Sequence, residues 1–503
     1  MIPAAMLQAD CNESCDFANT SKSFLSVRPQ GQSHSPELVS AARYDRENAK
    51  EGGRHGWLQF VAFGGQTTNS ENLSRYFSVG GKHVMTVKSS SSVIADGVAG
   101  DILADHFNVF TQDNLFESTI SLCPEQSTFG FIFHGRKGFW QNADADRGFW
   151  GSISFPVTRI QNKLNFKEDV TNNGGGVDAT DSPAAVANMT QAFRQSAWKY
   201  GKITCDTLTQ TGVADVELKV GYEWLEHEPC HLESYVGVVI PAGNKPKGEY
   251  VFEPIVGNGK HFGVMWGGSA GMNFYEDEAR DRVLRVELAA HSQYLFSREQ
   301  VRSFDVKYKP WSRYMGVYSS LADATEADLL PTANFQANYQ TPGINIFTRP
   351  VDVTPGFSHN LTSAVTYSCK KLYGELGCNV FARQDECLEL ACSFPTDTAF
   401  KALAGGGETS VIRNITGFRA LDAAGQIALA DYETAVVKES DLDLNSAASP
   451  AFMSYTLYGT IGYRCDDHKY PIVAALGGSY EGAVETNGAV DRWTVWGKLG
   501  FSF

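Results

Sequence analysis

The chain has no run that approaches 18 consecutive apolar residues, although it is 503 residues long. A helix needs about that many to cross the hydrocarbon core of a bilayer, so the sequence predicts no transmembrane helix. Positive charge is also scarce: 42 Lys and Arg stand against 57 Asp and Glu, and the net charge is −15. Because nucleic-acid-binding surfaces are basic, this balance argues against nucleic acid as a partner.

The sequence also lacks the short motifs of common catalytic sites. It contains no Gly-rich phosphate loop, no G-x-S-x-G and no H-E-x-x-H. Two clusters, His227–His231 and Asp466–His468, carry residue types that bind metals. A zinc site needs three or four converging ligands, and both clusters fall in predicted short turns. We therefore expect no enzymatic activity, no metal and no cofactor.

What the sequence does contain is an amphipathic strand at its C-terminus. From Trp493 to Phe503, every second residue is apolar or glycine. Side chains of a strand alternate between its two faces, and about 11 residues suffice for a tilted strand to cross a bilayer. A lone strand in lipid would leave its backbone groups unpaired, so the pattern predicts a closed barrel. The alternative, an edge strand of a soluble β-protein, would be prone to aggregation.

This ending resembles the C-terminal recognition strand of Gram-negative outer-membrane β-barrels. The residues that carry the resemblance, as an assembly signal, are Trp493, Val495, Leu499, Phe501 and Phe503. The resemblance implies an outer-membrane location, in contact with lipid and lipopolysaccharide, and recognition by the barrel-assembly machinery.

Earlier segments repeat the alternation. Between Val213 and Leu225, apolar residues share one face, and Asp215, Glu217, Lys219 and Glu223 share the other. Such faces suit a wall between lipid and a water-filled lumen. The sequence thus predicts an all-β fold: a transmembrane antiparallel up-and-down barrel of about 16 strands with minor helix. The expected spans are 22–29, 57–64, 75–88, 102–111, 115–123, 127–138, 148–157, 213–225, 231–241, 261–274, 282–296, 356–369, 373–384, 451–464, 470–480 and 492–503.

The predicted connections alternate between brief and long, as the periplasmic turns and extracellular loops of outer-membrane barrels do. The long ones are 158–212, 242–260, 297–355 and 385–450. With an even strand count, both termini are expected in the periplasm and the long loops outside the cell. One connection, Cys123–Gln126, is short where a long loop is expected. Helices are predicted near residues 36–50 and 184–200.

The N-terminus and the cysteines add two expectations. Residues 1–21 are interpreted as the remnant of a signal peptide with a periplasmic segment, and residues 22–503 as a single barrel. Ten cysteines, an even count, fit an oxidising compartment. Cys369 and Cys378 are a candidate disulfide across neighbouring strands.

The charged residues of the inward faces are the candidate site. They either create a field across the lumen that orients polar solutes, or pair with each other along the wall. The predicted pore-lining residues are Asp215, Glu217, Lys219, Glu223, Arg285, Glu287, His291, Glu375, Arg383 and Lys498.

Strand number and loop alternation also resemble the general porins, which are trimers of 16-stranded barrels with an inward-folded loop. The resemblance implies a homotrimeric porin that passes small hydrophilic solutes or ions by passive diffusion, with loop 158–212 as the candidate constriction. An alternative is a structural surface protein whose long loops mediate lattice, adhesion or host contact. An outer-membrane hydrolase and a soluble all-β protein are weaker alternatives.

Overall fold

In the computed structural model, residues 21–29, 35, 38, 56–89, 92, 100–113, 115–142, 147–178, 185–227, 229–320, 323, 341–400, 436–465, 470–484 and 490–503 are described. Within these residues, no helix is both long and apolar enough to span a membrane.

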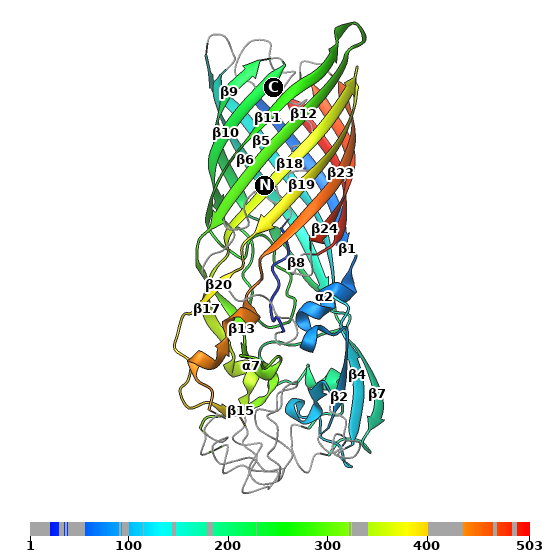
Figure 1. The fold of residues 1–503 in the computed structure, drawn as a ribbon, viewed down its shortest axis with the longest axis vertical. Helices are drawn as coiled ribbons and strands as arrows, with labels where there is room; N and C mark the ends of the chain where they lie inside the picture. Colours follow the sequence, from blue (N-terminus) through cyan, green and yellow to red (C-terminus); the bar gives the residue numbers. More distant parts are fainter. Residues whose placement is uncertain are drawn as a thin grey trace.

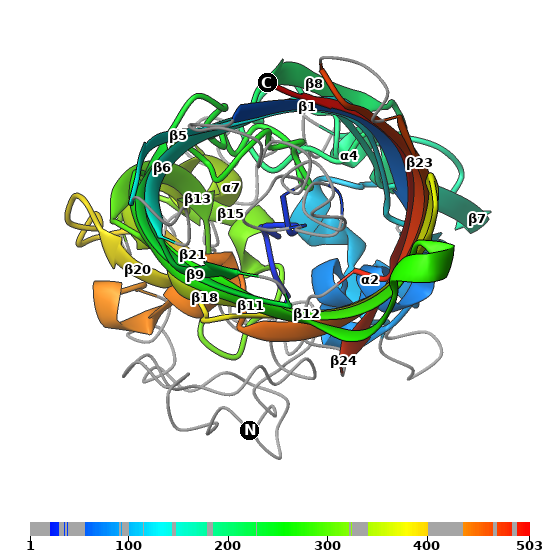
Figure 2. The same ribbon diagram turned by 90° about the horizontal axis from the view of Figure 1, so that it is seen from above.

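Twelve antiparallel strands close into a barrel (Figures 1 and 2). The ring closes because β1 pairs with β5 on one side and with β25 on the other. A further strand, β8 (Leu208–Val213), pairs only with β6. The barrel strands are β1 (Gly56–Thr67), β5 (Glu125–Gln141), β6 (Gly148–Lys163), β9 (Val216–His227), β10 (Cys230–Ile240), β11 (Gly263–Asp277), β12 (Arg282–Leu295), β18 (Gly356–Cys369), β19 (Leu372–Arg383), β23 (Phe452–Cys465), β24 (Ile472–Val484) and β25 (Arg492–Ser502).

The barrel therefore has 12 strands and not about 16, so the general-porin architecture is not supported. Twelve of the predicted spans match barrel strands, and the four at 22–29, 75–88, 102–111 and 115–123 do not. Alternation shows that a segment has two unlike faces, but it does not say which sheet the segment joins. The exception at Cys123–Gln126 also disappears, because this short link joins the loop region to β5 and not two barrel strands.

The first of the four segments, residues 21–29, is extended but not in a sheet. The other three lie in the long connection between β1 and β5. This connection contains α2 (Ser70–Phe77), η3 (Val79–Gly81), β2 (Val84–Lys88), β3 (Ile102–Leu103), η4 (Ala104–Phe107) and β4 (Phe116–Ser121). The strands β3, β2, β4 and β7 (Lys167–Asn173) form a four-stranded sheet outside the barrel.

The long connections leave one end of the barrel, here called the loop end, and fold together into a loop domain (Figure 1). Its two largest hydrophobic clusters are built around Phe107, Phe193 and Trp311 and around Phe347 and Val351. Its other elements are α4 (Met189–Ala192), β13 (Arg298–Ser303), β14 (Asp305–Val306), η6 (Ser312–Tyr314), β15 (Gly316–Tyr318), β16 (Thr341–Pro342), α7 (Gly343–Ile346), β17 (Thr348–Thr354), β20 (Cys387–Leu390), β21 (Ala399–Phe400), η7 (Glu439–Asp441), β22 (Leu442–Asp443) and η8 (Leu444–Ala447).

The opposite end, here called the short-turn end, has brief connections, such as η5 (Glu278–Arg280) between β11 and β12. Of the two predicted helices, the one near 184–200 is reduced to the single turn α4. The one near 36–50 lies almost wholly outside the described residues.

Apolar side chains cover the outside of the barrel and polar ones fill the inside. Leu376, Ile461 and Leu476 are 73%, 72% and 72% exposed, whereas Lys498 and Glu375 are each 2% exposed. The predicted face assignment of the C-terminal strand agrees with this: Trp493, Val495, Leu499, Phe501 and Phe503 all face outward and are exposed. Their role as an assembly signal stays a prediction.

Aromatic side chains in the lumen cover glycines of neighbouring strands. In each case the register sets the aromatic residue directly opposite the glycine, as for Gly477 and Trp496. A Cβ atom on Gly477 would lie 2.4 Å from the Trp496 ring. Because the ring occupies the space a side chain would take, it fixes the strand register. The other such pairs are Gly221–Trp150, Gly377–Tyr458, Gly462–Tyr373 and Gly130–Phe63.

Among the cysteines in the described part of the chain, these seven are free thiols: Cys123, Cys205, Cys230, Cys369, Cys378, Cys392 and Cys465. The suggested Cys369–Cys378 disulfide is therefore wrong. The register pairs Cys369 with Leu372 and Cys378 with Ser363, which separates the two thiols along the strands.

We predict that Gly477→Ala destabilises the barrel by about 1–3 kcal/mol, because the new methyl group overpacks against buried Trp496. Gly478→Ala is the matched control, since its Cβ would meet only ordinary contacts, the nearest at 3.6 Å. Urea unfolding of refolded protein in detergent measures both. Equal stability of the two variants would contradict the proposed role of the ring.

Candidate functional site: the barrel lumen and its N-terminal segment

The described parts of the N-terminal segment, residues 21–29 and Leu38, contact the loop domain and the lumenal wall. Residues 21–29 lie at the loop end, and the dark-blue segment appears inside the ring in Figure 2. Further along, Leu38 is fully buried against Val61, Phe63 and Trp496 on the lumenal wall. The chain then enters β1 at the short-turn end, where Gly56 pairs with Phe503. Residues 21–29 are therefore at the loop end; the N-terminus itself, with the interpretation of residues 1–20 as a signal-peptide remnant, lies outside the described residues.

Arg28 ties this segment to the lumenal wall. Its guanidinium group donates hydrogen bonds to Glu481 at 2.8 Å, Asn379 at 2.7 Å and Asn360 at 3.1 Å. These three acceptors come from β24, β19 and β18. Glu481 also accepts from Arg492 at 2.6 Å, so its carboxylate lies between two arginines. Charge-assisted bonds of this kind are about twice as strong as neutral ones, and here they join the segment to three strands.

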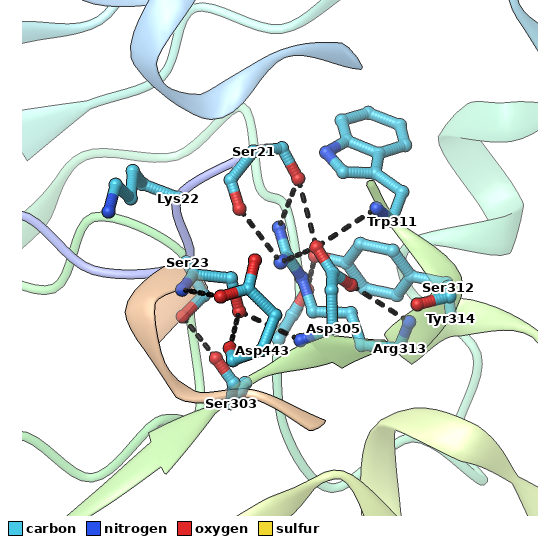
Figure 3. Close-up of polar contacts among 12 residues, drawn as sticks. Ser21, Lys22, Ser23, Ser303, Asp305, Trp311, Ser312, Arg313, Tyr314 and Asp443 are labelled. Atoms are coloured by element: carbon cyan, nitrogen blue, oxygen red, sulfur yellow. Dashed lines mark hydrogen bonds and ion pairs between the residues drawn. The ribbon is translucent and has the colours of Figure 1, made fainter. Parts of the chain in front are cut away.

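The start of the segment is anchored in the loop domain (Figure 3). Buried Asp305 accepts hydrogen bonds from Ser21 Oγ at 3.1 Å, Trp311 N at 3.0 Å and Arg313 Nη1 at 2.7 Å. Burial raises the pKa of the Asp305 carboxyl, and the Arg313 charge opposes that rise. The backbone of Lys22 donates to Tyr76 O. The N-terminal segment is thus hydrogen-bonded to two separate loops.

Little space remains around residues 23–29. Three cavities border them, with volumes of about 50, 30 and 20 Å³. A water molecule needs roughly 10–15 Å³ by this kind of measure, so each cavity holds only a few waters. These three cavities beside residues 23–29 are thus too small for more than a few water molecules each.

In the half of the barrel near the short-turn end, Arg136 pairs with two carboxylates of the lumenal wall. It donates to Glu223, and to Glu233 at 2.8 Å. Its guanidinium carbon lies 3.8 Å from the centroid of the Trp150 ring. One cation thus separates two carboxylates that would otherwise repel each other.

The ten predicted pore-lining residues are placed as follows. Lys219 contacts Glu217 at 3.2 Å, His291 bonds to Tyr235 at 2.7 Å, and Arg285 donates to His231. Glu375 lies within electrostatic reach of Lys498 and Glu287, and Arg383 stacks on Phe452. Glu223 contacts Arg136, as described above. Asp215 accepts from Asn258 N at 2.7 Å, and burial raises its pKa to about 7. Most of these groups thus have wall partners; whether they line a conducting pore stays a prediction.

Four charged lumenal residues were missed from the sequence: Arg136, Glu233, Glu481 and Arg492. Arg136 and Glu233 lie on the inward faces of correctly predicted strands and could have been found by alternation. Glu481 lies one residue beyond the predicted end of its strand. Arg28 could not be found, because its segment was interpreted as part of the wall.

The constriction predicted for loop 158–212 is wrong for the described part of that loop. Residues 158–163 continue β6, and Met189, Phe193 and Trp198 are in the core of the loop domain. Among the described residues, Arg28 and Leu38 of the N-terminal segment contact the lumenal wall. Among the described residues, no group of three or more His, Cys, Asp or Glu could hold a metal ion.

No protein-family model matches this chain, and no curated protein sequence matches it. Solved structures of barrels do match. An outer-membrane channel from Pseudomonas putida F1 is 6% identical, with a TM-score of 0.39, over 91% of this chain and 98% of that one.

Two further matches have similar coverage. The transport unit of the autotransporter AIDA-I from Escherichia coli is 7% identical, with a TM-score of 0.33, over 95% of this chain and 99% of that one. A FadL homologue from Pseudomonas aeruginosa is 8% identical, with a TM-score of 0.29, over 97% and 96%. Sequence identities and TM-scores this low show a general likeness to outer-membrane barrels and nothing about the function of this chain.

We predict that Arg136→Met destabilises the barrel by about 3–5 kcal/mol, because it leaves two buried carboxylates without their shared cation. Adding Glu223→Gln should restore part of this loss, since it removes one of the two charges. A double-mutant cycle in urea measures the coupling. Additive effects of the two substitutions would contradict the proposed bridge.

Proposed function

We propose that this protein is an outer-membrane β-barrel that passes small hydrophilic solutes through its lumen. The observation that carries the proposal is the inverted surface of the barrel: Leu376, Ile461 and Leu476 on its apolar outside are more than two-thirds exposed, while Lys498 and Glu375 are buried inside. Water would not favour that arrangement, but lipid outside and a polar lumen inside would.

In this conformation Arg28 and Leu38 of the N-terminal segment contact the lumenal wall. Passage therefore requires the N-terminal segment to shift, and the polar wall of Asn360, Thr362, Asn379 and Thr456 would then face the solute. The proposal includes no chemical step. By analogy with known barrels, the loop domain would lie outside the cell and the short turns in the periplasm. Barrel-assembly machinery, lipopolysaccharide and a trimeric state remain expectations from the resemblance.

A second candidate, a surface protein that binds neighbouring or host cells, is favoured by one observation. The loop domain has two hydrophobic clusters of its own, which a simple pore does not need. Adhesion of expressing cells, compared with cells that lack the protein, tests this candidate. Conductance in planar bilayers without adhesion would favour the channel.

We predict that Leu457→Lys lowers barrel stability in lipid by about 2–4 kcal/mol, because a charge on the lipid face near mid-membrane is costly. Leu457 is 59% exposed and lies midway along β23. Val84→Lys is the matched control, since Val84 is 51% exposed but lies in the loop domain. Unfolding from lipid vesicles measures both. Equal costs for the two variants would show that Leu457 does not face lipid.

We predict that Arg28→Glu opens the lumen, because the new carboxylate faces Glu481 and repels it. Single-channel recording should show at least a several-fold rise in mean conductance over the wild-type protein. Arg75→Glu is the control, since Arg75 is exposed on α2 and undergoes the same change of charge. If neither wild type nor Arg28→Glu conducts, the channel proposal fails.

A further inference from the structure

A small cavity borders the N-terminal segment at the loop end and contains two buried arginines. The cavity has a volume of about 50 Å³. Arg302 comes from β13 of the loop domain, and Arg383 is the last residue of β19. Residues Phe24, Ser26 and Pro29 of the N-terminal segment form another side. The cavity thus lies where barrel, loop domain and N-terminal segment meet.

Both arginines have hydrogen-bond donors without partners. Arg302 donates from Nη2 to Gln300 Oε1 at 2.6 Å and contacts Glu386 at 3.5 Å. Its Nε and Nη1 atoms are buried and unpaired, and so are Nε and Nη2 of Arg383. A buried donor without a partner costs about 1–3 kcal/mol, and more when it is charged. Four such nitrogens belong to two residues that line one cavity, and none of them has an acceptor among the described residues of the protein.

The charged groups around the cavity indicate that the missing acceptor carries a negative charge. Glu386 is the one carboxylate among its described lining residues, and it also accepts from Ser449 N at 3.0 Å. Glu253 is within electrostatic reach of Arg302, but its carboxylate already accepts from four backbone N–H groups between Lys247 and Tyr250. The pKa of buried His261 is lowered by desolvation, so this imidazole is neutral at pH 7.

The arginines themselves stay charged. Desolvation lowers the pKa of Arg302 to about 10, and nearby Arg383 repels its charge, whereas Glu386 acts in the opposite direction. A pKa of about 10 leaves Arg302 protonated at neutral pH. Two positive charges therefore lie near each other out of water with one described lining carboxylate, Glu386, between them, which leaves an excess of positive charge at the cavity.

We propose that this cavity binds a small oxyanion, a carboxylate or a phosphate group. Its oxygens would accept hydrogen bonds from the free guanidinium nitrogens of Arg302 and Arg383, a geometry that suits arginine. The bound anion would link the barrel rim to the loop domain next to residues 24–29. It would therefore stabilise the N-terminal segment in the lumen. This site does not depend on conduction, so it can be tested without a membrane.

The test uses the full chain, refolded in detergent at low chloride and constant ionic strength. Inorganic phosphate, acetate and chloride are titrated separately by isothermal titration calorimetry. We expect saturable binding of one phosphate or acetate per chain. In Arg383→Met the dissociation constant should rise at least tenfold. The same variant should be more stable than wild type without anion, because it removes one of two buried positive charges that share the single described lining carboxylate, Glu386.

Arg349→Met is the matched control. Arg349 lies on β17, away from the cavity lining, and donates to Ser393 O at 3.0 Å; its loss should leave anion binding unchanged. The proposal is overturned if no oxyanion binds saturably, if only chloride binds, or if Arg383→Met and Arg349→Met bind phosphate equally. Arg302→Gln is a second variant, whose loss of binding adds support if it folds.

Discussion

A strand that faces lipid has no water with which to pair its backbone, and every other feature of this structure depends on that constraint. The twelve barrel strands satisfy it by pairing in a closed ring, since β1 meets β25 as well as β5. Closure then divides the side chains into two populations. Those outside must be apolar, and those inside have to satisfy their hydrogen bonds within a narrow lumen. The apolar side chains on the outside and the charged ones on the inside therefore both follow from the need to pair every backbone N–H and C=O group in a closed ring.

The lumen meets its own requirement with side chains from distant parts of the sequence. Arg136 lies between Glu223 and Glu233, and Glu481 lies between Arg28 and Arg492. Removing one member of such a group leaves a buried charge without compensation and is costly, whereas the intact group contributes little net free energy of stabilisation. The charges seen in the sequence as a pore lining are thus first of all partners of each other. In the proposed channel, the lumenal charges that stay unpaired after the N-terminal segment has shifted would set the selectivity for solutes.

The sequence allowed the barrel wall to be predicted, but not everything attached to it. Twelve strands could be found because each has strict alternation over enough residues, as in Leu376 and Leu457 outside against Glu375 and Thr456 inside. Alternation is equally present in β4, which belongs to a small sheet in the loop domain, so the strand count was too high. The place of residues 21–29 could not be predicted, because a segment that belongs to no sheet follows no periodicity. Its contacts, such as Arg28 with Glu481, join residues 453 positions apart.

The N-terminal segment makes hydrogen bonds to both the loop domain and the barrel wall. Within three residues it bonds to Asp305, Tyr76 and Ser446, which come from three different long connections. A few residues later, Arg28 bonds to the barrel wall. Withdrawing the segment would therefore expose polar groups on both sides at once: Asp305 in the loop domain and Glu481 in the barrel would each lose a partner. Opening the lumen and loosening the loop domain are for that reason coupled in free energy. Any ligand that binds one of the two parts only when the segment is in place must favour the closed state of the other.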